Sequence, residues 1–80
     1  MFVNVGFANF VASDKIIAIL DADSSPAKRL SRTAKESDLL IDATCGRKTR
    51  SVIVMESNHV VLSAIESDVF GSKLDNVSEK

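Results

Sequence analysis

The chain has 80 residues and a formal net charge of −1, and 45% of its residues are apolar. This length allows one domain, and a single cysteine excludes a disulfide within the chain. One cysteine and one histidine match no structural zinc site, and three scattered glycines exclude a P-loop or a dinucleotide-binding loop. The chain shows no signal peptide and no apolar run of membrane-spanning length. We therefore expect a cytoplasmic protein without a cofactor, a membrane partner or a small-molecule substrate.

The N-terminal part of the chain predicts short strands. Phe2 to Val5 begins a strand that Gly6 ends or bulges, and Phe10 to Ala12 is a second apolar patch. Ile16 to Leu20 is a continuous apolar run typical of a buried strand. Lys15 is expected at the entrance of that strand.

A helix is expected from about Ser25 to Ser37. Ser24 or Ser25 is a suitable N-cap, and Pro26 suits the first helical position. The apolar residues of the helix form a narrow stripe, Ala27, Leu30 and Ala34.

The same helix carries a stripe of basic residues, which are Lys28, Arg32 and Lys35 with Arg29 beside them. Such residues are ordinary on the solvated face of an amphipathic helix. The alternative is a secondary basic face for nucleic acid, formed by Lys28, Arg29 and Arg32.

Two apolar segments joined by a cationic link follow the helix. Alternating residues from Leu39 to Ala43 precede a continuous apolar run from Val52 to Met55. The link, Cys45 to Arg50, contains a glycine and three cations. The pattern predicts a β-hairpin over residues 39–55 that presents Gly46 to Arg50 at the edge of a sheet.

The cations of this link are Arg47, Lys48 and Arg50. The two arginines offer planar forks for phosphate oxygens, and the lysine offers a point charge. A surface turn that is charged for solubility would have the same sequence. The chain has no Trp or Tyr to stack on unpaired bases, so the duplex backbone suits this link better than a single strand.

The remaining elements complete an α+β fold. Glu56 to His59 is predicted as the turn of a second hairpin, and Val60 to Ile65 as its second strand. Ser67 to Leu74 is expected to form a short helix, and residues 75–80 a flexible polar tail. The order predicts one domain over residues 1–74. Its small, mainly antiparallel sheet has about five strands, including a three-strand meander, with one principal helix packed on it.

An enzyme is not favoured by these residues. Cys45, His59 and Asp42 are all present, so a cysteine-nucleophile site can be imagined. Cys45 is expected to close an apolar strand as a small buried thiol, and His59 lies in a separate turn. Nothing in the sequence places the two within hydrogen-bonding reach, so we expect no enzymatic activity.

Several blocks of the sequence resemble the RemA-like regulatory proteins of bacteria. These blocks are VNVGFANFVASDKIIAIL, SSPAKRL and LLIDATCGRKTRSVIVMESNHVVLSAI, and the similarity extends from about Phe2 to Leu74. The resemblance implies a nucleoid-associated DNA-binding transcriptional regulator of extracellular-matrix genes for biofilm formation. It also implies a ring-shaped homo-oligomer whose repeated basic surface contacts double-stranded DNA.

The resemblance further implies DNA contacts at Lys15, Arg47 and Lys48. Lys15 and Lys48 stand where the family often has arginine, so the charge is kept but a bidentate fork is lost. Cys45 stands where tyrosine is common, so no aromatic contact carries over.

Oligomerisation and DNA binding support each other physically. Three cations per subunit give a slope of only about −3 in log K against log salt, which describes a weak monomeric binder. A closed ring repeats the patch and makes later contacts intramolecular. The competing hypothesis is a non-enzymatic assembly or adaptor protein whose basic hairpin binds an acidic protein. The near-zero net charge and the abundant apolar residues motivate that alternative.

Overall fold

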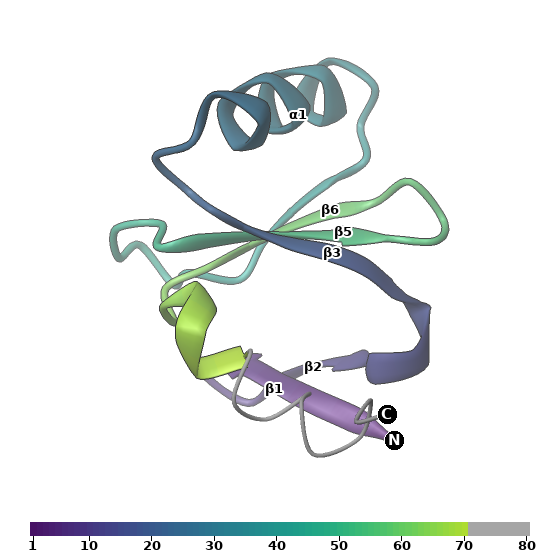
Figure 1. Cartoon of the computed structure of the whole chain (residues 1–80), viewed down its shortest axis with the longest axis vertical. Coiled ribbons are helices and arrows are strands. Elements are labelled where there is room, and N and C mark those ends of the chain that lie inside the picture. Colours follow the sequence, from purple (N-terminus) through teal and green to yellow (C-terminus); the bar gives the residue numbers. More distant parts are fainter. Residues whose placement is uncertain (71–80) are drawn as a thin grey trace.

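The computed structural model describes residues 1–70, which form three layers (Figure 1). Helix α1 (Ser25–Glu36) covers one face of a four-stranded sheet, and a two-stranded ribbon lies on the other side. Residues 67–70 are helical, as predicted, while the rest of the predicted helix and the predicted tail at 75–80 lie outside the described residues. The α+β class predicted from the sequence is therefore confirmed.

The four-stranded sheet has the order β3–β5–β6–β4. β3 (Ile16–Asp21), β5 (Ser51–Met55) and β6 (Val60–Ser63) pair antiparallel, and β4 (Leu40–Asp42) pairs parallel to β6. The hairpin predicted around Glu56 to His59 is confirmed, since it joins β5 directly to β6.

The hairpin predicted over residues 39–55 is wrong, and with it the three-strand meander. β6 lies between β4 and β5, so these two strands are not neighbours. The connection between them crosses the end of β6. There the amide of Ala43 donates to the Leu62 carbonyl at 2.9 Å, and the amide of Arg50 donates to the Ser63 carbonyl at 2.8 Å. The alternating segment and the continuous apolar run correctly indicated two strands, but they did not indicate which strands pair.

The two-stranded ribbon consists of β1 (Phe2–Gly6) and β2 (Asn9–Ala12), paired antiparallel. The bulge expected at Gly6 is present, because the register shifts between Asn4 and Gly6. Phe7 and Ala8 form the tight turn with φ values of 53° and 63°. Tight turns with positive φ at both central residues usually contain Asn-Gly or Asp-Gly. Phe7-Ala8 carries no such signal, so this turn was not predicted from the sequence.

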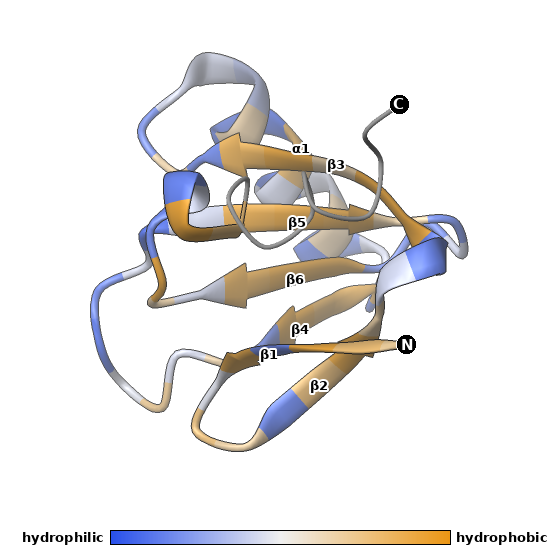
Figure 2. Cartoon of the chain, turned by 60° about the horizontal axis from the view of Figure 1, so that its bottom comes forward, coloured by the Kyte–Doolittle hydropathy of each residue, from blue (hydrophilic) through white to orange (hydrophobic). Residues whose placement is uncertain are grey.

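The sheet buries apolar side chains on both faces, and Figure 2 shows its strands predominantly in the colour of hydrophobic residues. The cluster between the sheet and α1 consists of Ala27, Ala34, Val52 and Val60. The cluster between the sheet and the ribbon consists of Val3, Val5, Ala43, Ile53, Val61 and Phe70. Val52 and Ile53 are therefore buried on opposite faces of the sheet. Burial on both faces explains why β5 is a continuous apolar run in the sequence.

Two buried serines tie the ribbon side to the end of β6. The hydroxyl of Ser63 donates to the Val5 carbonyl at 2.7 Å and accepts from the Ile65 amide at 3.1 Å. The hydroxyl of Ser51 donates to the Ile65 carbonyl at 2.8 Å. The Ser63 carbonyl also accepts from the Arg50 amide, so Ser63 connects the ribbon to the end of the cationic segment that precedes β5.

Helix α1 begins where the sequence predicts. The Ser24 hydroxyl accepts from the Ala27 amide at 3.3 Å, as an N-cap does. Ala27 and Ala34 are buried against the sheet, whereas Leu30 is 37% exposed, so the buried stripe is narrower than predicted.

Candidate nucleic-acid interface

The cationic connection between β4 and β5, residues 43–50, is termed here the basic loop. Its chain reverses at a tight turn in which the Arg47 amide donates to the Thr44 carbonyl at 3.0 Å. The central residues, Cys45 and Gly46, have φ values of 55° and 82°. Gly46 thus supplies the backbone freedom expected of it. Cys45 is exposed, which corrects the prediction of a buried thiol, because β4 already ends at Asp42.

The start of the basic loop is anchored by Asp42 and Thr44. One carboxylate oxygen of Asp42 accepts from the Thr44 hydroxyl at 2.6 Å and from the Thr44 amide at 2.9 Å. The hydroxyl and then the amide lower the pKa of Asp42, since both bonds favour the charged carboxylate. Thr44 is buried, so this local bond network holds the loop against the sheet end.

Three cations of the basic loop gather around one hollow. Arg47, Lys48 and Arg50 are exposed and line a space of about 420 Å³ together with Ala64. This space is termed the loop hollow. The backbone at both ends of the loop, Ala43 and Arg50, is hydrogen-bonded to β6, so the cations project from a restrained backbone. The structure therefore brings together these three predicted residues despite the wrong strand pairing.

Two neighbours of these cations were not predicted from the sequence. The guanidinium carbon of Arg47 lies over the Phe7 ring, 5.6 Å from its centre. Arg50 and Glu66 form an ion pair at 3.7 Å, with both side chains about half exposed. No spacing or motif signals either contact, because each one depends on the ribbon or the C-terminal segment folding back to the basic loop.

Lys15 lies away from the basic loop. Ile16, which follows Lys15 in the chain, pairs with Met55 at one end of β5. Asp21 pairs with Ser51 at the other end, and Ser51 directly follows Arg50. Lys15 and the loop thus sit at opposite ends of β5, and five residues of strand span roughly 16 Å.

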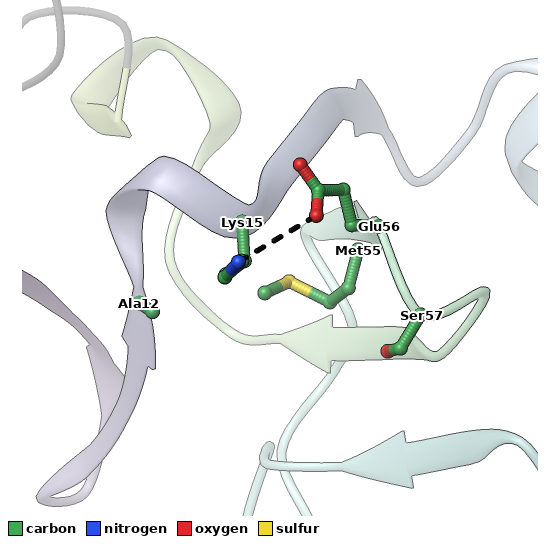
Figure 3. A pocket seen from close by; sticks show the side chains of 5 residues that line it. All are labelled: Ala12, Lys15, Met55, Glu56 and Ser57. Carbon is green, nitrogen blue, oxygen red and sulfur yellow. Dashed lines mark ion pairs between the residues drawn. The ribbon is translucent and has the colours of Figure 1, made fainter.

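Lys15 has its own surroundings, as Figure 3 shows. It forms an ion pair with Glu56 at 3.7 Å, and both side chains are 60% exposed. The pair borders a separate hollow of about 450 Å³, into which Met55 points. Lys15 is at the entrance of β3, as predicted, but one subunit does not unite it with Arg47.

The predicted secondary basic face consists of three exposed residues of α1 at different angles around the helix axis. Arg29 and Arg32 are exposed, at about 150° around the helix axis from the buried alanines, given 3.6 residues per turn. Lys28 is nearer to the sheet side and lines a hollow that Lys48 also lines. Lys28 and Arg32 are one helical turn apart and so are neighbours on the helix surface, and the secondary basic face of Lys28, Arg29 and Arg32 stays a prediction.

The candidate enzyme residues are separated in the structure. Cys45 lies in the basic loop at the Ser51 end of the sheet. His59 lies in the turn between β5 and β6 at the other end, where its carbonyl accepts from the Met55 amide at 2.9 Å and its ring meets the Ser57 hydroxyl. A Cys45–His59 pair is thus not assembled within one chain.

Fold and site together define a small α+β protein that presents a held cationic loop at one end of its sheet. Within residues 1–70, no helix is long and apolar enough to cross a membrane. The family model described as extracellular matrix regulatory protein A-like matches residues 2–74. The chain belongs to the RemA-like family.

Curated relatives carry the same kind of name. A protein of Desulfatibacillum aliphaticivorans is 50% identical over 98% of this chain and 88% of its own length. One from Nitratidesulfovibrio vulgaris strain DP4 is 48% identical over 96% of this chain and 90% of its own. One from Kosmotoga olearia is 51% identical over 89% of this chain and 72% of its own. Each is named "Putative regulatory protein", so the chain is similar to proteins of a regulatory type.

Proposed function

We propose that the protein is a non-enzymatic transcriptional regulator that binds double-stranded DNA through the basic loop. The observation that carries this proposal is the exposure of Arg47, Lys48 and Arg50 around one hollow on a hydrogen-bonded loop. Arginine forks and a lysine point charge match phosphate oxygens. Backbone contacts of this kind position a protein on a duplex without reading its sequence.

The proposed working unit is a homo-oligomeric ring. Three cations per subunit give a salt slope of about −3, which describes weak binding, and a ring multiplies such contacts. Exposed apolar side chains offer surface for subunit contacts: Phe2 is 70%, Phe10 59%, Ile17 62% and Ile41 48% exposed. Ile17 and Ile41 lie on β3 and β4, the two edge strands of the sheet.

Within this proposal Lys15 is a separate contact. Because Lys15 lies at the far end of β5, it would contact a different phosphate from the one that Arg47 contacts. That phosphate would lie beside the same subunit or at the boundary with the next subunit. The proposed cellular setting is the nucleoid in the cytoplasm, and the proposed targets are extracellular-matrix genes of biofilm formation, in keeping with the family description.

The decisive experiment is light-scattering mass determination of the purified protein with and without a duplex fragment, at several salt concentrations. We expect one oligomeric mass alone and a larger, salt-sensitive complex with the duplex. The matched variants are Arg47→Gln in the basic loop and Arg29→Gln on the outer face of α1. The first should lose the complex with the oligomer intact, and the second should keep it.

A protein that never retains duplex DNA at physiological salt would contradict the proposal. Co-purification of an acidic protein that Arg47→Gln releases would instead support an assembly or adaptor protein.

A further inference from the structure

Lys48 stands between two hollows. On one side is the loop hollow with Arg47 and Arg50. On the other side is a hollow of about 370 Å³ between the basic loop and α1, termed the helix hollow. Its polar lining comes from three segments: Lys48 and Thr49 of the loop, Lys28 and Ser31 of α1, and Asp23 before the helix. Its floor is formed by apolar side chains of β5 and β6.

The helix hollow offers two ammonium groups and one hydroxyl to a ligand. Lys28 and Lys48 are exposed and come from different elements. The Ser31 hydroxyl donates to the Ala27 carbonyl at 2.8 Å, so its proton is engaged within the helix. Thr49 is half-buried, and its hydroxyl makes no hydrogen bond to residues 1–70. Ammonium and hydroxyl donors suit an oxyanion such as a phosphate.

We propose that the helix hollow holds a second DNA backbone phosphate, adjacent to the one at the loop hollow. Lys48 is shared by both hollows, so the DNA strand would run from the basic loop onto α1 at Lys28. This inference rests on the proposed function, and it assigns Lys28 and Thr49 to the primary interface. Arg29, which lies on the outer side of the helix, stays outside that interface.

Asp23 makes the inference testable in both directions. Its carboxylate lines the same hollow and repels a phosphate there. Its amide donates to the Asp21 carboxylate at 2.9 Å, a bond that the substitution Asp23→Asn leaves in place because it involves the backbone. Removing this charge therefore strengthens phosphate binding in the helix hollow.

The test is fluorescence anisotropy with a labelled duplex across a salt series, on the full chain in its native oligomeric state. The variants are Lys28→Gln and Lys48→Gln, with Arg29→Gln as the neighbouring control of equal charge change. Each lost phosphate contact lowers the steepness of log K against log salt by about 0.9 per bound subunit. We expect a reduction for Lys28→Gln, a reduction at least as large for Lys48→Gln, no reduction for Arg29→Gln, and tighter binding for Asp23→Asn.

Two results would overturn the inference, and only the second would also contradict the proposed function. If Lys28→Gln matches Arg29→Gln while Lys48→Gln and Arg47→Gln bind weakly, DNA contacts the loop alone and the proposed function stands. If none of the loop variants changes duplex binding, the proposed function falls as well. All five substituted residues are exposed, and light scattering of each variant verifies that the oligomer is intact.

Discussion

The ring of Phe7 lies against the guanidinium of Arg47, with 5.6 Å between the guanidinium carbon and the ring centre. Phe7 belongs to the tight turn of the β1–β2 ribbon, and Arg47 belongs to the basic loop. The ribbon thereby contributes to the candidate interface although it carries no cation of its own. An arginine over an aromatic face is attracted by the ring quadrupole, which restrains where the guanidinium points.

Phe7 and Arg47 should therefore be energetically coupled. A double-mutant cycle of Phe7→Leu and Arg47→Gln, followed by urea unfolding, is expected to give a coupling of about 0.5–1 kcal/mol, as for an exposed cation–π pair. Phe7→Tyr is the control, because it keeps the ring and should keep the coupling. Additive effects of the two substitutions would show that the contact is not energetically significant.

Arg50 is held by Glu66, so removing that carboxylate should free a cation for DNA. Glu66→Gln is expected to tighten duplex binding by an amount within the about 0.2–1 kcal/mol typical of exposed pairs, with little change in folding stability. Glu36→Gln on α1 is the charge-matched control, measured in the same anisotropy titration. A gain no larger than that of Glu36→Gln would mean that the ion pair does not restrain Arg50.

Ser63 should be important for stability, because its buried hydroxyl bridges β6 to the ribbon. Ser63→Ala leaves the Val5 carbonyl without its donor and the Ile65 amide without its acceptor. We expect a loss of about 1–3 kcal/mol in the free energy of unfolding, measured by urea denaturation. The exposed Ser57→Ala should change stability by less than about 0.5 kcal/mol. Equal effects of the two variants would refute the bridging role.

Asp42 should contribute to acid stability through Thr44. Its pKa is lowered in the folded protein, so this contribution is complete above the unfolded value of 3.8 and is lost as the pH falls through the lower folded value. Thr44→Val removes the hydroxyl donor and should raise the pKa of Asp42 toward 3.8, as followed by NMR titration of its carboxyl group. It should also flatten the fall in stability below that pH. A pKa for Asp42 that is unchanged in the variant would contradict this account.

Much of the local structure follows from the sequence because local physics produces it. Ser24 and Pro26 mark the start of α1, since a side-chain acceptor and a preset φ act within one helical turn. The hairpin around Asn58, whose φ is 74°, follows from polar residues between two apolar runs. The sequence also carries the family membership, and it places the cations at positions 47, 48 and 50 together because they are near neighbours in the chain.

Strand order and the surroundings of those cations required the tertiary structure. The alternation from Leu39 to Ala43 indicates which side chains share a face, but it does not indicate that β4 pairs with β6 rather than with β5. Tertiary packing separates Lys15 from Arg47 and brings Phe7, Glu66 and Lys28 to the basic loop. Such contacts join residues far apart in the chain. They are decided by the burial of apolar surface between layers, which a local pattern does not encode.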